Sequence, residues 1–357
     1  MRPRSASRPV GTWIVVLVGF LGAACGPAAP PAAAPPAATP LAAGAVPAAA
    51  PVAQAPISVR VSYASPAVSH ATIWVAQDRG FFREYGLDVD LVFLSGTLTD
   101  QGVTTGETPI GHGTNLIPTR LAGADLVGVA GVVQRMTFTL FTRPEITSAD
   151  QLRGKTILTS RPGAAASTAT LLTLEHLGLQ PHRDVQLQPT GGTVEKMALM
   201  LQGLGDASLY SLPDDLQAQQ AGLVPLLNLS QLPIPFMQTV IGTTRAYARD
   251  NEEVVRRFLR GYVAAVASAR ADAQGTQAIM SKYMQLEDPF LLDYGYRYYR
   301  DIWARPDFRV QPEAVQANLR LLEDVPGAAT ARPEDFIDNR FIDELHASGF
   351  IREVGAE

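Results

Sequence analysis

The sequence predicts an α/β protein that is built from two lobes, and three observations lead to this prediction. Short β-prone runs alternate with helical patterns between residues 57 and 243, an order typical of a mostly parallel sheet covered by helices. The globular part is roughly 300 residues long, which is more than a single hydrophobic core usually serves. Two segments of the chain connect the halves, and such a double connection allows a hinged closure.

The start of the chain has the features of a secretion signal. Three arginines precede an uncharged apolar run over 10–21, and small residues follow it over 22–26. The run is short for a membrane span. Cys25 is the only cysteine of the chain, and its place resembles that of the lipid acceptor in bacterial lipoproteins, although Gly22 replaces the usual aliphatic residue. We predict a lipoprotein signal peptide over 1–25 with lipidation of Cys25. Ordinary cleavage that releases a soluble secreted protein is the alternative.

Residues 26–56 are almost entirely alanine and proline. This segment has no charge and no periodic apolar face, so it cannot bury a core of its own. We predict a tether that holds the globular part off a membrane surface.

The first lobe is expected to begin with strands that alternate with helices. Strands are predicted over 57–63, 87–94, 108–115, 126–133 and 136–143, with a helix over 69–79. The carboxyl ends of parallel strands lie at one edge of a sheet, and ligands collect there. The residues at these ends carry neutral hydrogen-bonding groups: Ser65, Ser95, Thr97, His112, Thr114 and Gln134.

The second lobe is expected to begin near Ser148 with a strand, a turn and a helix over 151–179. The turn contains Pro162, Gly163 and small residues, so the free N–H groups at the start of the helix are open to a ligand. These donors favour an anionic or carbonyl-rich group; an ordinary strand–helix turn is the alternative. Further strands are predicted over 185–188, 206–210 and 223–229, and further helices over 194–201 and 214–221. The strand predicted over 238–243 is expected to return to the first lobe.

Helices dominate from residue 251 to the end of the chain. Apolar residues repeat at helical spacing over 252–270, 278–283, 290–299, 314–322 and 339–351. One aromatic group suggests either a ligand cage or helix packing, and we interpret its members as packing residues: Tyr294, Tyr296, Tyr298, Tyr299 and Trp303.

Four segments resemble a known family in their order and spacing. They are ATIWVAQDRGFFREYGLDVDL (71–91), DQLRGKTI (150–157), LMLQGLGDASLYSLP (199–213) and FIDELHASGF (341–350). The chain resembles the periplasmic substrate-binding proteins of ABC importers for nitrate, sulfonates and taurine, which are relatives of the thiamine-pyrimidine synthases. The resemblance implies a type II periplasmic-binding-protein clamshell, a central cleft, and delivery of a small molecule to an ABC permease and its ATPase. It also implies a monomer in the periplasm or on the outer face of the cytoplasmic membrane.

The chain pattern and the resemblance together predict the domain boundaries and the residues of the ligand site. Lobe 1 is expected to comprise 57–147 and 238–357, with the C-terminal helices, and lobe 2 to comprise 148–237. Many members open the second-lobe helix with a Gly-Ser/Thr pair, but this chain has Gly163 followed by alanines. We therefore expect a neutral or singly anionic organic ligand, such as an aromatic one, rather than nitrate or sulfonate. The expected ligand-binding residues are Ser65, Pro66, His70, Ser95, Thr97, His112, Gly113, Thr114, Gln134, Arg135, Ser160, Gly163, Ala164, Ala165, Tyr210 and Gln238.

The sequence gives little support to an enzyme or to a nucleic-acid binder. The synthase relatives need cysteines around an iron site, and the only cysteine of this chain lies in the signal. The five histidines have no paired metal-ligand spacing, although His70 and His112 would form a metal or pH-sensitive pair if the fold joined them. The formal net charge of −5 excludes a broad basic surface for nucleic acid. We expect no catalytic residue, metal or cofactor; a ligand sensor on the same fold and a non-canonical synthase-type enzyme are the alternatives.

Overall fold

The computed structural model describes residues 55–162, 164–303, 307–322 and 325–357. The predicted signal peptide, its Cys25, the tether up to residue 54 and the predicted site residue Gly163 lie outside the described residues. No helix within the described ranges is both long enough and apolar enough to cross a membrane.

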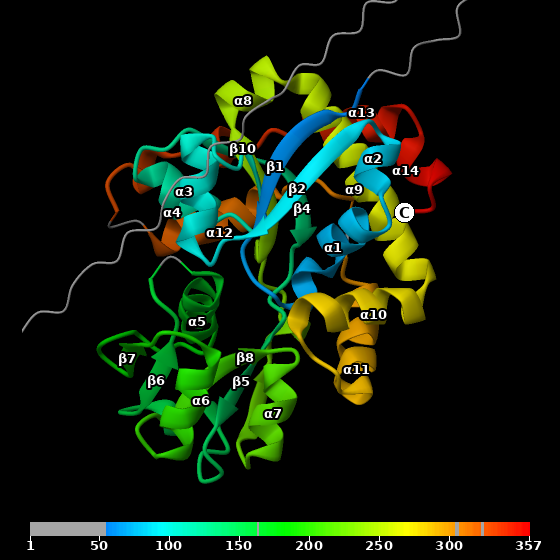
Figure 1. Cartoon of the computed structure of the whole chain (residues 1–357). Coiled ribbons are helices and arrows are strands. Elements are labelled where there is room, and N and C mark those ends of the chain that lie inside the picture. The colour runs from blue at the N-terminus through cyan, green and yellow to red at the C-terminus, as the bar shows by residue number, and fades with distance from the viewer. Residues whose placement is uncertain (1–54, 163, 304–306, 323–324) are drawn as a thin grey trace, which may run out of the picture. The chain divides into compact units, whose positions relative to one another are not determined.

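The first lobe is organised around a five-stranded sheet in the order β2-β1-β3-β10-β4 (Figure 1). Strands β2 and β3 pair with β1 in parallel, whereas β10 runs antiparallel between β3 and β4. The carboxyl ends of β1 to β4 and the start of β10 therefore share one edge of this sheet. The strands are β1 (Ile57–Tyr63), β2 (Leu87–Phe93), β3 (Ile110–His112), β4 (Leu126–Val133) and β10 (Thr239–Thr244).

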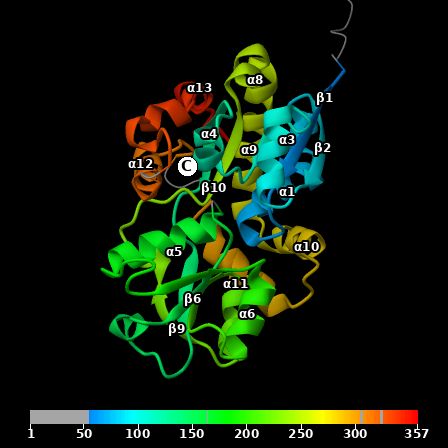
Figure 2. The same cartoon turned by 90° about the vertical axis from the view of Figure 1, so that its left-hand side faces the viewer.

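The second lobe contains the other five-stranded sheet, in the order β7-β6-β8-β5-β9. Figure 2 shows helices α5 and α6 lying beside this sheet. The carboxyl ends of β6 to β9 share one edge, because only β5 is antiparallel to its neighbours. The elements are β5 (Phe138–Thr142), β6 (Thr156–Thr159), α5 (Ala165–His176), β7 (Gln186–Pro189), α6 (Thr193–Leu201), β8 (Ala207–Ser211), α7 (Asp214–Gln220) and β9 (Val224–Asn228).

The structure differs from the expected boundary between the lobes at the first crossing. The β-prone run that precedes Ser148 was assigned to lobe 1, yet its strand β5 lies in the second sheet, paired with β8 and β9. The chain thus crosses at 134–137, directly after β4. The pairing partners of a β-prone segment are set by the rest of the sheet, so the sequence of that run does not reveal them. The other predicted boundaries remain predictions.

Helices complete the first lobe. The early ones are α1 (Ala71–Asp78), α2 (Phe81–Glu84), α3 (Thr97–Thr105) and α4 (Leu116–Leu121). The late ones are α8 (Arg245–Asp250), α9 (Glu252–Ala271), α10 (Ala273–Met284), α11 (Pro289–Arg300), α12 (Pro312–Leu321), α13 (Arg340–Ala347) and α14 (Phe350–Glu353). Of these, α2, α3, α4 and α8 were not predicted from the sequence.

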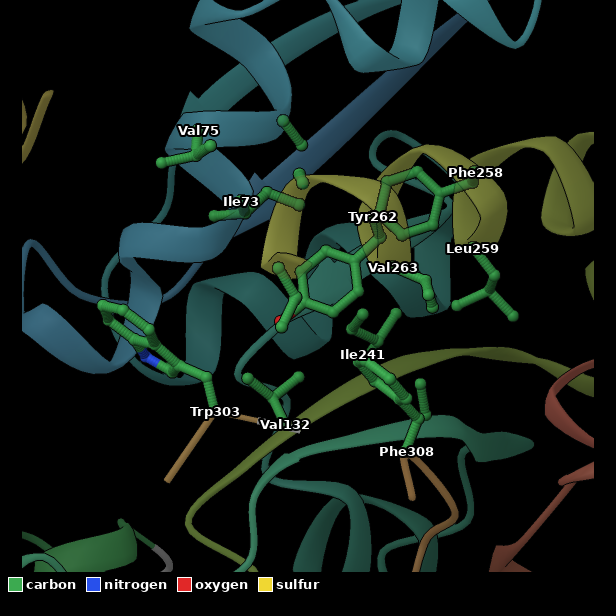
Figure 3. Close-up of a cluster of buried hydrophobic side chains, with 14 of the residues drawn as sticks. Ile73, Val75, Val132, Ile241, Phe258, Leu259, Tyr262, Val263, Trp303 and Phe308 are labelled. Atoms are coloured by element: carbon green, nitrogen blue, oxygen red, sulfur yellow. The ribbon is translucent and has the colours of Figure 1, made fainter. Parts of the chain in front are cut away.

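The main hydrophobic core lies between the first sheet and the helices α1 and α9. Figure 3 shows Ile73 of α1, Ile241 of β10, and Phe258 and Tyr262 of α9 gathered in this core. All four side chains are fully buried. Each such side chain contributes roughly 1.5–3 kcal/mol through the removal of apolar surface from water. The late helix α9 is therefore part of the same core as the first strands, which are far from it in sequence.

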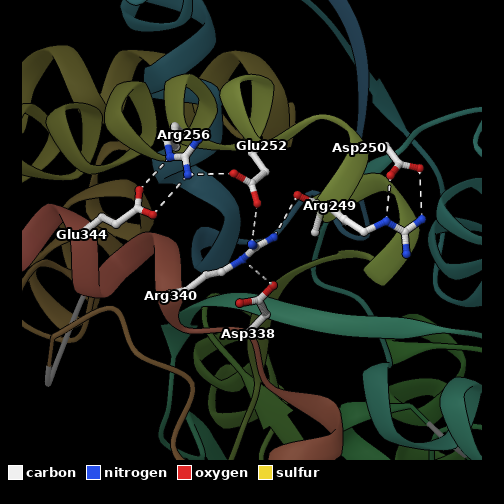
Figure 4. A network of polar contacts seen from close by, with 8 residues as sticks. Arg249, Asp250, Glu252, Arg256, Asp338, Arg340 and Glu344 are labelled. Carbon is white, nitrogen blue, oxygen red and sulfur yellow. Dashed lines mark hydrogen bonds and ion pairs between the residues drawn. The ribbon is translucent and has the colours of Figure 1, made fainter.

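A network of ion pairs joins α9 to the C-terminal helix α13 (Figure 4). Arg256 contacts Glu344 at 2.7 Å and Glu252 at 2.9 Å. Arg340 contacts the other oxygen of Glu252 at 2.5 Å and also contacts Asp338 at 3.2 Å. Isolated surface pairs stabilise little, but several charges that share partners hold one another in place. The network thus fixes α13 against the first lobe.

Each lobe also contributes side chains to the core of the other. Leu212, next to α7 in the second lobe, belongs to the core of the first lobe, and Leu216 packs against that core. In the opposite direction, Ala317 of α12 is buried in the core of the second lobe, with Leu321 beside it. The two lobes are thus in contact at α7 and at α12, in addition to the connecting segments.

We expect Phe258→Ala to lower the free energy of unfolding by about 3–5 kcal/mol, because it leaves a cavity in the main core. The ring of Phe258 is fully buried and stacks on Phe82 with ring centroids 4.9 Å apart. Phe290→Ala is the matched control; that ring is 62% exposed, and its loss should change the free energy by less than about 0.5 kcal/mol. Urea denaturation measures both variants, and equal losses would contradict this packing.

Candidate ligand-binding site

The predicted residues of the first lobe collect at the carboxyl edge of its sheet. Tyr63 of β1 is aligned with Phe93 of β2 and with His112 of β3, so the three strands end together. The loop after β1 is tied to the neighbouring loops, because the Ala64 N–H donates to the His112 carbonyl at 3.1 Å and the Ala64 carbonyl accepts from the Gly96 N–H at 3.3 Å. The loop residues that are at least partly exposed at this edge are Ser65, Pro66, Ser95 and Thr97.

An opening of about 580 Å³ lies along α3 and α4, which start at this edge; first-lobe residues make up its lining except for Pro162 of the second lobe. This volume is within the range of small-molecule sites. Helices α3 and α4 form one side, and Pro162, in the turn after β6 of the second lobe, lies on the other. The lining includes Thr97, Asp100, Asn115 and Thr119 and contains no lysine or arginine among the described residues. We call this opening the α3–α4 cavity.

A buried carboxylate organises the wall of the α3–α4 cavity. Asp100 is 2% exposed and accepts hydrogen bonds from the Asn115 N–H at 2.8 Å, from the Asn115 side-chain amide at 3.1 Å and from the Thr119 hydroxyl at 3.1 Å. Burial raises the pKa of Asp100, and these hydrogen bonds oppose the increase. The carboxylate fixes the start of α4 and leaves a negative group behind the cavity wall.

A second, smaller opening of about 30 Å³ lies where four parts of the chain meet. It has room for about one or two water molecules. Its lining brings together the predicted residues Thr114, Ala165 and Gln238, and adds Thr168 of α5 and Asn318 of α12. Asn318 is 8% exposed and was not predicted, because α12 is distant in sequence and nothing in its pattern marks this residue as facing the other lobe.

Gln238 connects the two crossings between the lobes. Its side-chain oxygen accepts hydrogen bonds from the N–H of Thr137 at 2.8 Å and from the Thr137 hydroxyl at 2.7 Å. The same hydroxyl lies 2.6 Å from the Tyr299 hydroxyl of α11. Thr137 belongs to the first crossing and Gln238 to the second, so this group, which we call the hinge brace, holds the two segments side by side. The carbonyl group of the Gln238 side chain is thereby engaged within the protein.

The other predicted residues near the first crossing differ in exposure. Gln134 is buried; its side-chain oxygen accepts from the Gln311 N–H at 3.0 Å, while its side-chain nitrogen has no partner among the described residues. Arg135 is exposed to solvent. Gln134 is therefore held against the 307–311 segment, and Arg135 is free to extend from the hinge.

The structure brings His70 and His112 together beneath the sheet edge, with ring centroids 4.9 Å apart. Gly113 makes this possible: its φ is +95°, and a Cβ there would lie 2.6 Å from Nε2 of His70. His112 Nε2 lies 3.3 Å from the Tyr262 hydroxyl, which itself contacts Thr72 at 2.7 Å. Burial lowers the pKa of His70 to about 4 and that of His112 well below its ordinary value. Both rings are therefore neutral at pH 7.

The predicted site residues of the second lobe lie in two different places, the turn before α5 and the core. Ser160, Ala164 and Ala165 follow β6, and Ala164 begins α5 without a side-chain hydrogen bond to the helix. Tyr210, in contrast, is 1% exposed, and its ring lies 5.8 Å from that of Phe141 in the core. It lines neither opening. An alternating strand does not by itself tell which side faces a core, so the sequence could not place this ring.

The described residues contain no group of three or more His, Cys, Asp or Glu side chains arranged to hold a metal ion. The two histidines form a pair without a third such ligand. In the described ranges, the site presents hydroxyl, amide and backbone groups together with the buried Asp100 carboxylate.

Two five-stranded α/β lobes joined by two adjacent crossings define the fold of the periplasmic binding proteins. The family described as NMT1/THI5 like matches residues 67–276, and the chain belongs to this family. The predicted resemblance to the nitrate- and sulfonate-type binding proteins is thereby confirmed. A protein of Bacillus subtilis (strain 168) named "Putative binding protein YtlA" is 28% identical over 141 residues, which is 36% of this chain and only 41% of that protein.

Solved structures confirm the predicted two-lobed type II fold. The periplasmic aliphatic sulphonate binding protein SsuA from Escherichia coli is 19% identical, with a TM-score of 0.65 over 79% of this chain and 99% of that chain. The periplasmic nitrate-binding protein NrtA from Synechocystis PCC 6803 is 13% identical, with a TM-score of 0.65 over 84% of this chain and 91% of that chain. At these identities the likeness establishes the fold.

We expect His70→Gln to make the stability of the protein less dependent on pH. Because the pKa of His70 is about 4 when folded and 6.5 ordinarily, the unfolded chain takes up a proton first as the pH falls. The stability is therefore fully present above pH 6.5 and is lost as the pH falls towards 4. Between pH 7 and pH 5, the decrease in unfolding free energy should be smaller in the variant by about 1–2 kcal/mol.

Urea titrations at several pH values measure this slope. His176→Gln, at an exposed position of α5, is the control and should leave the slope as it is. An unchanged slope in the His70 variant would mean that the buried ring accepts a proton without loss of stability.

Proposed function

We propose that this protein is an extracytoplasmic solute-binding protein that captures a small organic molecule and delivers it to an ABC importer. The observation that carries this proposal is the α3–α4 cavity, which is large enough for a ligand and is lined from both lobes. Membership of the NMT1/THI5 like family supports it. Binding occurs through closure of the lobes and includes no covalent chemistry.

The chemistry of the lining supports a neutral ligand with hydrogen-bonding groups. Asp100 places a negative charge behind the wall, and the described lining has no cationic side chain to balance an anion. Threonine hydroxyls and the Asn115 amide suit carbonyl, hydroxyl or amine groups. A bare inorganic anion would find hydroxyl and amide donors in the described lining but no cationic side chain to balance its charge. We therefore favour an organic molecule over nitrate. We propose that the residues that contact the ligand belong to the predicted set at the carboxyl edges of the two sheets. Asp100, Asn115 and Asn318 are proposed to contact it as well.

A thermal-shift screen of the purified protein against sulfonates, nitrate, carboxylates, pyrimidines and aromatic acids tests this function. A ligand at one hundred times its dissociation constant should stabilise the protein by roughly 2.7 kcal/mol, which raises the melting temperature.

For a ligand found in this screen, Thr97→Val should weaken binding about threefold to tenfold through the loss of a hydroxyl that lines the cavity. Thr147→Val, at an exposed position outside the cavity, is the matched control. Equal affinities would remove the cavity from the proposal, and turnover of a substrate would favour an enzyme.

We further propose that Cys25 carries a lipid and that 26–56 tether the protein to the outer face of the cytoplasmic membrane. Two acyl chains provide the stable anchoring that one chain does not. In cells fed a labelled fatty acid, the wild-type protein should be labelled and should fractionate with membranes, whereas Cys25→Ser should remain unlabelled and be released. Ser65→Ala controls for expression. A Cys25→Ser protein that remains labelled and on the membrane would rule out this anchor.

A further inference from the structure

A separate groove lies between the second lobe and helix α11. Its volume is about 310 Å³, and it shares no lining residue with the α3–α4 cavity or with the small opening. Strands β5 and β9 and helix α7 form its second-lobe side, with Asp215, Gln219 and Asn228 in the lining. Tyr294 of α11 lines it from the first lobe. The lining also includes Thr139 and Phe141 of β5, so four polar side chains and two aromatic rings border a single space of ligand size.

Asp215 has no cationic partner among the described residues. Its carboxylate accepts a hydrogen bond from the Leu216 N–H at 2.8 Å, and no described lysine or arginine is close enough to form an ion pair. Burial also raises the pKa of its neighbour Asp214, but there Lys196 lies near enough to oppose the increase. Burial raises the pKa of Asp215 to about 6, with a smaller contribution from Asp214. A cation that approached Asp215 would therefore stabilise its ionised form.

Tyr294 supplies an accessible aromatic face. It is 39% exposed, whereas Tyr296, Tyr299 and Trp303 of the same aromatic group are 3% or less exposed and pack in the core. Phe290 stacks on Tyr294 with ring centroids 6.2 Å apart and is itself 62% exposed. The interpretation of the whole group as packing residues thus fits the three buried members but not Tyr294. Exposed aromatic rings beside a carboxylate attract organic cations, because the ring face is negative.

We propose that this groove is a binding site for a small organic cation, with the ammonium group between the Asp215 carboxylate and the face of Tyr294. Gln219 and Asn228 supply hydrogen bonds to substituents of the ligand. The groove is distinct from the cavity of the proposed function, so the two proposals stand or fall separately. Because the groove is lined by both lobes, a bound cation also adds a contact between α7 and α11.

The test is a calorimetric titration of the purified protein with choline, and with 3,3-dimethylbutan-1-ol, its uncharged analogue of the same shape. Choline should bind and the alcohol should not. Asp215→Asn removes the charge while it preserves the shape, and Tyr294→Leu removes the aromatic face; each should weaken choline binding at least about fivefold. Asp88→Asn on β2 and Thr97→Val in the α3–α4 cavity should leave choline binding unchanged.

Several results would overturn the proposal. They are the absence of choline binding, equal binding of the alcohol, and choline binding that is unchanged in both groove variants. Loss of choline binding in Thr97→Val but not in the groove variants would assign the cation to the other cavity and would also overturn it. Thermal melting confirms that each variant is folded. Tyr294→Leu, at a partly exposed position, keeps the test decisive if the Asp215 variant is unstable.

Discussion

The contact between Thr137 and Gln238 is the constraint on which the arrangement of the lobes depends. The chain passes between the sheets twice, once after β4 and once before β10, and these residues join the two passages through one side-chain oxygen. Tyr299 adds α11 to the same group. Since all three partners are buried or partly buried, breaking the group would leave polar atoms without partners, which costs more than the hydrogen bonds themselves contribute. The two crossings are therefore held side by side by one shared group.

Rotation of one lobe relative to the other must then be accommodated next to the hinge brace. On one side, α12 meets α5 through small side chains such as Ala317 and Ala169, which belong to one core cluster. Interfaces of small residues permit sliding with little change in side-chain packing. On the other side, Leu216 packs against the core of the first lobe beside the α11 groove. A molecule in the small opening beside α12, or in the groove beside α11, therefore acts on the contacts that set the relative position of the lobes.

The sequence predicted the strands well because most are short β-prone runs, apolar or alternating, that end at clear turn signals. It did not predict α3 and α4, the helices that form the cavity. Helix α3 is rich in threonine, whose helix propensity is low, and the hydroxyls of Thr104 and Thr105 instead bond to carbonyls one turn earlier. Helix α4 contains Pro118 within its six residues. Tertiary packing overrides such weak local preferences, and Asp100, which anchors α4, could not be identified from its local sequence.

Strand register explains why some site residues were foreseeable and others were not. The alignment of β1 with β3 places both loops at one edge, as expected for parallel strands, so Ser65 and Gly113 could be predicted as neighbours. To predict that His70 and His112 pair, one must also know that Gly113 leaves space for the His70 ring. To predict Asn318 as a site residue, one would have to know the path of α12, which is distant in sequence from the rest of the site. Residues contributed by remote helices are the part of a site that local patterns do not reveal.

The histidine pair and Asp100 together determine the charge that a ligand meets at the first-lobe edge. Two imidazolium groups there would make a site for anions, but burial keeps both rings neutral at pH 7. The Asp100 carboxylate is buried nearby, held by donors that have no net charge. An anion would thus approach a fixed negative group with no positive side chain in the described lining to offset it. Under the proposed function, this balance of charge, more than the shape of the fold, favours a neutral organic ligand over nitrate.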